Sequence, residues 1–373
     1  MPTPTPHPAT PELPDAPDLR DLRDLRDLLD AGAPLSRPTV AGHAVAVYRD
    51  QGGIADAVAR ATTWGLPLIG LLRGGDDDDH AWVRPLARAS GVVPHVAVVT
   101  GDAGAWPTAA RFADAVLAVG RPTDGGAPTA AAQPADLHAA TPAEAAALLG
   151  DVLDHLPATC LADPPTVAPA PPRLAPDTLR TLVPDVPDLP YDVGALLDAV
   201  LDPGGVRLGG RSALVRVLAR VEGHPVGVVA TDPSHRQGVP AAADARAAAR
   251  FVSWCDAFGL PVLTLLDSPA ALVPLHVDHP DAACALARAF GDATSGLVTV
   301  LVRRAQPAPG GPAGLPGAGA DVTLAWPQVG PGAPAAALVV PPERTRAEVA
   351  AALALARSRR DLPGPRRHPV LPR

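Results

Sequence analysis

Apolar and polar positions form two kinds of block along the chain. Runs of five to eight residues, such as LPLIGLL (66–72) and GLVTVLV (296–302), are almost wholly apolar. Such runs are typical of parallel strands that are covered on both faces. Between them lie Ala-rich stretches such as IADAVARATTW (54–64) and ADARAAARFVSWCDAF (243–258), whose apolar side chains recur at spacings of three and four. This alternation of strands and helices predicts an α/β fold built on parallel sheets.

Four of these blocks occur twice, in the same order and about 181 to 207 residues apart. The matching pairs are 42–48 with 223–229, 64–72 with 258–266, 89–99 with 293–302, and 112–119 with 319–327. Chance similarity does not preserve order over four segments. The chain is therefore predicted to contain two copies of one unit.

The predicted organisation has five parts. We expect a disordered leader with a short helix (1–36), a first unit (37–156), a Pro-rich linker (157–190), a second unit (191–361) and a tail (362–373). The helix is expected over DLRDLRDLRDLLD (18–30), where leucines three apart form one apolar stripe. We interpret it as a docking or capping helix, with a partner-binding helix as the alternative.

Composition excludes several classes of function. All 31 basic residues are arginine, which rules out a phosphate-loop lysine, a Schiff base and a biotinyl-lysine on this chain. A net charge of −8 argues against non-specific nucleic-acid binding. Three scattered cysteines suggest no disulfide framework, so a cytoplasmic location is expected. No stretch approaches the roughly 20 apolar residues of a membrane span, and no membrane association is expected.

Ligands of parallel α/β sheets bind in the loops that follow the carboxyl ends of strands. That rule directs attention to four loops in this sequence, two in each predicted unit. They cover residues 73–80, 101–108, 267–274 and 306–319.

Other groups of reactive residues have structural interpretations. DDDDH (76–80) and HVDH (276–279) are carboxylate and imidazole clusters, but neither predicts a metal site. Four adjacent Asp residues cannot all face one ion, and HVDH lies between Pro274 and Pro280 with no further ligand nearby in the sequence. Ser234–His235 lacks the Gly-x-Ser-x-Gly context of a nucleophile and is interpreted as a polar loop. Cys255, beside apolar aromatic residues of the helix 243–258, is interpreted as a core thiol.

Several segments together resemble the carboxyltransferase β subunit of biotin-dependent acyl-CoA carboxylases of the propionyl-CoA or acetyl-CoA type. The resemblance covers roughly residues 37–373. The segments that carry it are ASGVVPHVAVVTG (89–101), TLVPDVPDLPYDV (181–193), AARFVSWCDAFGLPVLTLLDSP (248–269), GADVTLAWP (319–327) and ERTRAEVAAALALARSRR (343–360).

The resemblance implies a fold, a reaction and partners. The two units are then tandem crotonase-like carboxyltransferase domains, and the family's reaction moves a carboxyl group from carboxybiotin to an acyl-CoA. Carboxybiotin is carried by a partner subunit, so no cofactor is expected on this chain. The implied partners are a biotin carboxylase or biotin carrier subunit, and further carboxyltransferase subunits in a homo- or hetero-oligomer.

The resemblance also places oxyanion donors in the first unit. Backbone N–H groups in glycine-rich turns stabilise the negative charge that develops on a thioester oxygen. Gly74 and Gly75 stand where the family has a Gly-Gly-Ala turn. Gly104 and Ala105 stand at its second turn, with one glycine fewer.

The corresponding turns of the second unit depart from the family pattern. Ala270, in DSPAALVP, occupies the first glycine position of a Pro-Gly-Phe-like turn. Pro307, Ala308 and Pro309 fall on the Gly-Gly-Ala turn of the biotin side. Because proline has no N–H, these positions are degenerate as donors.

We therefore expect a carboxyltransferase-like subunit whose transfer of the carboxyl group is impaired or lost. Two alternatives remain at this point. One is a non-catalytic scaffold or partner within a carboxylase complex. The other is an enzyme that acts on CoA esters without biotin and needs a single oxyanion hole.

Overall fold

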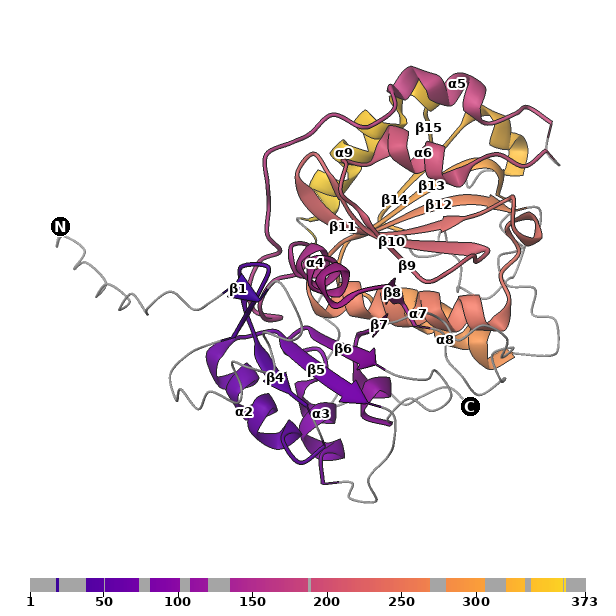
Figure 1. The fold of residues 1–373 in the computed structure, drawn as a ribbon. Helices are drawn as coiled ribbons and strands as arrows, with labels where there is room; N and C mark the ends of the chain where they lie inside the picture. The colour runs from indigo at the N-terminus through magenta and orange to yellow at the C-terminus, as the bar shows by residue number, and fades with distance from the viewer. Residues whose placement is uncertain are drawn as a thin grey trace, which may run out of the picture.

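The computed structural model describes most of the chain between residues 38 and 359. The described residues are 18–19, 38–49, 51–73, 81–100, 108–119, 135–186, 189–268, 280–305, 320–332, 337–357 and 359. Within them, two large sheets lie one above the other, with helices between and outside them (Figure 1).

The first large sheet has five strands, all parallel, in the order of the sequence. Its strands are β4 (Ala46–Tyr48), β5 (Leu68–Arg73), β6 (His95–Thr100), β7 (Ala115–Val119) and β8 (Leu137–Ala139). Helices α2 (Ile54–Trp64), α3 (Val83–Ala89) and α4 (Pro142–Leu153) and the 3₁₀ helix η1 (Thr108–Phe112) connect or follow these strands.

The second large sheet has seven strands in the order β15-β14-β13-β12-β11-β10-β9. They are β9 (Val206–Leu208), β10 (Leu214–Val221), β11 (His224–Thr231), β12 (Val262–Ser268), β13 (Leu297–Ala305), β14 (Val322–Ala325) and β15 (Leu338–Val339). Strands β11 to β15 are parallel, whereas β10 is antiparallel to both of its neighbours.

The helices of the second half flank this sheet on both faces. They are α6 (Val193–Val200), α7 (Ala242–Ala257), α8 (Pro280–Asp292) and α9 (Thr345–Ala356), with short turns η3 (Arg236–Gly238), η4 (Pro327–Gly332) and η5 (Pro342–Arg344). The segment 157–186 contains only η2 (Pro176–Thr178) and α5 (Leu179–Leu182). Its many prolines explain this, because proline supplies no N–H to a helix or sheet.

The two halves repeat the same topology, as the sequence repeat predicts. Strands β4 to β8 and β11 to β15 follow one order, and α2, α3 and α4 occupy the places of α7, α8 and α9. Details repeat too: Gly65 and Gly259, each in a left-handed conformation (φ 62° and 68°), follow α2 and α7. Among the described residues, the antiparallel β9–β10 pair has no counterpart before the first copy. The limits proposed for the domains themselves stay a prediction.

The expected helix over 18–30 is wrong at its first two residues. Asp18–Leu19 forms a strand, β1, that pairs in parallel with β2 (Thr39–Val40), which in turn pairs with β3 (His43–Ala44). Strand pairing therefore overrides the local apolar stripe at this point. Residues 20–30 lie outside the described part of the chain.

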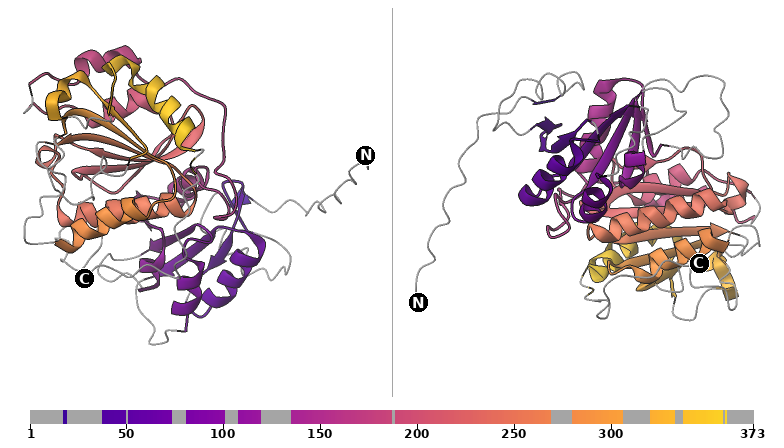
Figure 2. Two further views of the ribbon diagram at one scale, coloured as in Figure 1. Left: turned by 180° about the vertical axis from the view of Figure 1, so that it is seen from behind. Right: turned by 90° about the horizontal axis from the view of Figure 1, so that it is seen from below.

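Three apolar clusters separate the layers. One lies between the first sheet and helices α2 and α3, and one between the second sheet and helices α6 and α9. The largest lies between the sheets and joins both halves through α4, α7 and α8. Figure 2 shows α7 and α8 running between the two sheets.

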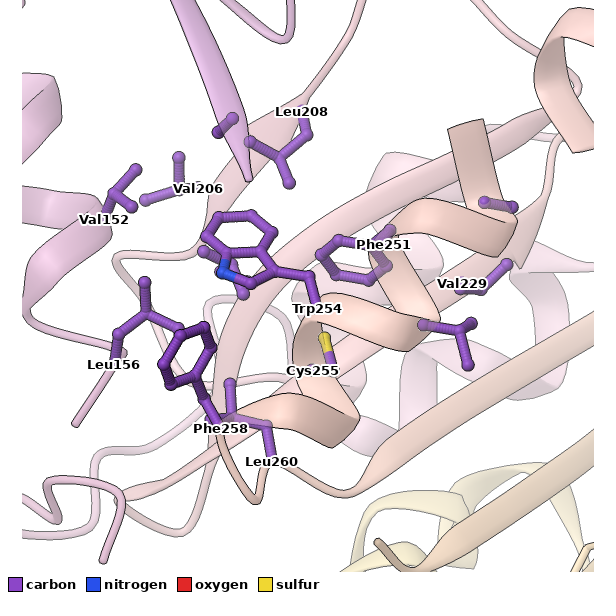
Figure 3. Packing of buried hydrophobic residues seen from close by; sticks show 14 of the residues in the cluster. Val152, Leu156, Val206, Leu208, Val229, Phe251, Trp254, Cys255, Phe258 and Leu260 are labelled. Atoms are coloured by element: carbon purple, nitrogen blue, oxygen red, sulfur yellow. The ribbon is translucent and has the colours of Figure 1, made fainter. Parts of the chain in front are cut away.

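Helix α7 provides the aromatic centre of that largest cluster. Trp254 and Phe258, 5% and 1% exposed, pack against Leu156 of the first half and against Val206 at the start of β9 (Figure 3). Cys255 is fully buried beside them, and burial raises the pKa of its thiol. The interpretation of Cys255 as a core residue is confirmed.

An Asp side chain binds the amino end of one strand in each half, β6 in the first half and β13 in the second. Asp114 Oδ2 accepts a hydrogen bond from the His95 N–H at 2.8 Å, and Asp321 Oδ2 accepts one from the Leu297 N–H at 2.7 Å. Burial raises the pKa of Asp114 to about 7, although the His95 N–H and the charge of Arg250 both act to lower it.

This raised pKa predicts a pH-dependent effect of Asp114→Asn. The amide oxygen still accepts the His95 hydrogen bond but carries no charge. Because the folded-state pKa lies above the ordinary value, the stability that protonation gives the wild type is lost as pH rises from about 4 to 7. The Tm of the variant should therefore rise relative to the Tm of the wild type between pH 4 and pH 7. The difference between the two Tm values should be largest at pH 8.

Asp321→Asn is the matched control. Asp321 contacts Arg359 at 3.3 Å, so its substitution removes an attraction and is not expected to raise the Tm at pH 8. An equal Tm change for Asp114→Asn at pH 4 and pH 8 would show that the buried charge of Asp114 costs nothing.

Candidate active site

The carboxyl ends of adjacent strands meet at the start of the loops that the sequence singled out. Arg73, the last residue of β5, pairs with Thr100, the last residue of β6. Ser268 of β12 pairs in the same way with Ala305 of β13, after a register shift that follows Leu266. In each half, two of the four expected ligand loops therefore begin side by side.

The predicted site residues themselves lie outside the described part of the chain. This holds for Gly74, Gly75, Gly104 and Ala105 in the first half and for Ala270, Pro307, Ala308 and Pro309 in the second. It holds also for the clusters 76–80 and 276–279. The assignment of donor roles to these residues stays a prediction, whereas the strand ends from which their loops start are described.

A buried ion pair lies at the strand ends of the second half. The Asp267 side chain at the end of β12 is 0% exposed and that of Arg303 near the end of β13 is 2% exposed. Arg303 donates to Asp267 Oδ2 from Nη2 at 3.0 Å and from Nε at 3.2 Å. Two donors on one carboxylate fix the guanidinium plane more firmly than a single contact does.

The same guanidinium holds the segment that connects the two halves. Arg303 Nη1 donates to the carbonyl oxygens of Pro184 and Val186 at 2.9 and 2.6 Å, and Nη2 donates to that of Leu189 at 2.9 Å. Its carbon Cζ lies 5.4 Å from the centre of the Tyr191 ring, within the range of a cation–π contact. Arg303 thus fastens the segment 184–191 to the strand ends.

The end of β11 completes this edge. The Asp267 N–H donates to Thr231 Oγ1 at 2.7 Å, and the Thr231 hydroxyl lies 3.2 Å from the Asp267 carbonyl oxygen. Next along the chain, Asp232 Oδ1 accepts from both the N–H and the hydroxyl of Ser234, at 2.9 and 2.6 Å. Ser234 is therefore bound to a carboxylate within a polar loop, in agreement with the interpretation made from sequence.

The first half has a different buried polar pair, which joins the last residue of β4 to the first residue of β6. Tyr48 Oη and His95 Nε2 are 2.8 Å apart in the core, where His95 begins β6. Burial lowers the pKa of His95 to about 4, so its ring is neutral near pH 7. Because both side chains are buried and each is the hydrogen-bond partner of the other, we interpret this pair as a structural feature of the core.

Asp267 and Arg303 are the residues that reasoning from sequence missed. The signal was present, because each is a charged residue at the end of an apolar strand, in TLLDS and TVLVRRA. A charge buried there must be paired. Hydrogen bonds already engage the polar atoms of both side chains. We therefore interpret the pair as a structural contact, called the Arg303 lock below, and not as an acid or base.

Comparison with known proteins gives the family. A profile described as "Carboxyl transferase domain" matches residues 118–329, more than half of the chain. The chain belongs to the carboxyl transferase domain family. The resemblance stated from sequence, to the carboxyltransferase β subunit of acyl-CoA carboxylases, is thereby confirmed.

Curated relatives support the same family. The carboxyltransferase subunit of propionyl-CoA carboxylase from Haloferax mediterranei is 35% identical over 213 residues, which cover 54% of this chain and 41% of that protein. A biotin-dependent acetyl-/propionyl-coenzyme A carboxylase beta5 subunit from Mycobacterium tuberculosis is 29% identical over 277 residues, 64% of this chain and 50% of that protein. The chain spans about half the length of these relatives.

Solved structures agree on the fold. A transcarboxylase 12S structure superposes with a TM-score of 0.75 at 20% sequence identity. The superposition covers 90% of this chain and 84% of the transcarboxylase chain. A single-chain long-chain acyl-CoA carboxylase gives 0.62 at 22% identity, covering 81% of this chain and 37% of its own. The prediction of two tandem crotonase-like units is confirmed.

Neither a metal-binding cluster nor a membrane-spanning helix occurs among the described residues. The part of the chain that the structure describes contains no group of three or more His, Cys, Asp or Glu side chains placed to hold a metal ion. Within the same residues, no helix has both the length and the apolar character needed to cross a bilayer.

The lock at Arg303 predicts a large loss of stability in Arg303→Met. Methionine keeps much of the side-chain volume but leaves the Asp267 carboxylate buried without its partner. Breaking such a pair costs about 3–5 kcal/mol, to be measured by urea unfolding. Limited proteolysis should also show earlier cleavage within residues 184–191.

Arg180→Met is the control for this substitution. Arg180 pairs with Glu343 at 2.7 Å on the surface, where its side chain is 61% exposed and water screens the two charges, so its loss should leave the free energy of unfolding almost unchanged. Similar losses in the two variants would contradict the role assigned to Arg303.

Proposed function

We propose that this chain is a carboxyltransferase-type subunit of an acyl-CoA carboxylase in which carboxyl transfer from carboxybiotin is impaired or lost. Family membership and the paired strand ends support the general assignment. The observation that carries the finer one is the sequence QPAPGGP (306–312), in which Pro307 and Pro309 stand at the donor turn of the biotin side. Neither proline has an N–H to offer a developing oxyanion.

The size of the expected defect follows from the chemistry of oxyanion holes. Transfer of the carboxyl group places negative charge on the biotin ureido oxygen and on the acyl thioester oxygen. Removing one preorganised donor from such a site costs about 10²–10³ in rate. The changes at Pro307, Pro309 and Ala270 all affect the biotin side. We therefore expect the half-reaction that involves biotin to be slowed more than the half-reaction that involves the acyl-CoA.

The first unit retains more of the expected donors. Gly74 and Gly75 follow β5 directly, and Gly104 and Ala105 follow β6 closely, so both turns start from neighbouring strand ends. Glycine permits the positive φ angles and the close ligand approach that such turns need. We therefore propose that acyl-CoA binding survives in the first unit, with Gly74, Gly75, Gly104 and Ala105 as candidate donors.

The proposal includes partners, a location and an organisation. A cytoplasmic complex with a biotin carboxylase or biotin carrier subunit, and with further carboxyltransferase subunits, follows from the family's reaction. In such a complex the chain contributes a two-domain scaffold whose limits are 37–156 and 191–361. A CoA-ester reaction without biotin is the alternative supported by the asymmetry between the two units, because it needs the first unit's donors alone.

One reconstitution tests the proposal. The purified chain is mixed with biotin carboxylase, biotinylated carrier, ATP, bicarbonate and propionyl-CoA, and methylmalonyl-CoA is measured. We expect a rate at least about 10²-fold below that of an active carboxyltransferase subunit under the same conditions, while calorimetry shows binding of propionyl-CoA. A rate equal to that of the active subunit would contradict the loss of function.

A second prediction concerns the two prolines. The double variant Pro307→Gly/Pro309→Gly restores two N–H groups, and we expect its methylmalonyl-CoA formation to rise by at least about tenfold over the wild type. The control is Pro312→Gly, which relaxes the same loop outside the donor turn. An equal rise in this control would show that loop flexibility matters and that the donors do not.

A further inference from the structure

The turn that follows β11 has an uncommon backbone conformation. Arg236, Gln237 and Gly238 all have positive φ angles, of 49°, 55° and 79°. The Gly238 N–H donates to the His235 carbonyl oxygen at 3.0 Å, which closes a left-handed turn of type I′. Two residues with side chains occupy its central positions, where Asn and Gly are preferred because a Cβ atom is strained there.

Strand pairing does not account for this strain. The other residues with side chains and positive φ among those the structure describes are Ala41 and Glu222, and both stand in two-residue hairpin loops. The twist of paired strands favours type I′ turns in such loops. The turn 235–238 instead joins a strand to helix α7, so no hairpin requires its conformation.

Neighbouring groups hold the turn in place from both sides. Asp232 fixes its beginning, because the His235 N–H donates to the Asp232 carbonyl oxygen at 3.0 Å and Ser234 donates to the carboxylate. Gly238 fixes its end: a Cβ atom at this position would lie 2.7 Å from the Asp267 carbonyl oxygen. Strain that a surrounding structure maintains is concentrated at active sites, ligand contacts and switch regions.

The turn presents hydrogen-bond donors to solvent. Arg236 and Gln237 are exposed, and Arg236 Nε donates to the carbonyl oxygen of Val239 at 3.3 Å. Within the described part of the chain, the Arg236 Nη atoms and the N–H groups of Arg236 and Gln237 have no hydrogen-bond partner. The turn stands at the carboxyl end of β11, beside the end of β12, at the edge where parallel sheets bind ligands.

We propose that the turn 235–238 binds an anionic oxygen group of a ligand through the Arg236 guanidinium and the N–H groups of Arg236 and Gln237. A guanidinium and adjacent backbone N–H groups suit a phosphate or a carboxylate. The ligand class rests on the proposed function, in which CoA carries phosphates and the carboxylated carrier a carboxylate. The turn is thus a contact of the second unit that the donor turns of the family do not include.

Binding of two probes to the full chain tests the proposal. Coenzyme A represents the phosphate source and malonate the carboxylate source, both titrated calorimetrically at low salt. Arg236→Ala should weaken binding of one probe or both by about tenfold or more, the loss of one charge-assisted hydrogen bond. Arg207→Ala is the control, because Arg207 is an exposed arginine of β9 in the same sheet, and its removal should change neither affinity by more than about twofold.

The outcomes separate this proposal from the proposed function. A loss confined to coenzyme A identifies a phosphate contact, and a loss confined to malonate a carboxylate contact. If the wild type binds coenzyme A and Arg236→Ala binds both probes as well as Arg207→Ala does, the turn is no ligand contact while acyl-CoA binding stands. If the wild type binds neither probe, both proposals fail.

The strain itself is tested separately. Gln237→Gly should raise the Tm, because glycine adopts a positive φ without a Cβ clash. A Tm that does not rise would remove the strain on which the proposal rests and overturn it.

Discussion

Charge that is removed from water must be matched, and the Arg303 guanidinium shows how this requirement organises the second half of the molecule. A buried guanidinium has five N–H donors, and the Asp267 carboxylate engages only part of them. The remainder are satisfied by carbonyl oxygens of a connecting segment that has no regular hydrogen-bonding pattern of its own. The strand ends and the connecting segment therefore complete each other.

The buried ion pair contributes more to the specific placement of the segment than to net stability. A well-packed apolar pair could be as stable as the ion pair, since desolvation cancels much of the attraction between buried charges. An apolar pair, however, would not select which carbonyl oxygens of the segment 184–191 face the sheet. A second buried arginine acts alike, because Arg346 donates to Ala170 and Val200 carbonyl oxygens and to Asp202. Together, the two arginines fasten the Pro-rich connection at two places, at Ala170 and between Pro184 and Leu189.

Local patterns predicted the regular elements well and the contacts poorly. Helix α2 has the limits expected from its apolar spacing, and α7 differs by one residue at each end, because burial of one helix face is encoded within a few turns. The carbonyl partners of Arg303, in contrast, lie 114 to 119 residues away along the chain, and no local pattern encodes such pairing. Asp18–Leu19 shows the same limit, since its strand partner is 21 residues away.

A further consequence follows from the use of arginine alone as the basic residue. A guanidinium presents five N–H donors in one plane, whereas an ammonium group presents three around one nitrogen atom. Arg303 uses this plane to reach one carboxylate and three carbonyl oxygens at once. A lysine in its place would have fewer donors than there are acceptors, so part of the connecting segment would lose its attachment to the sheet.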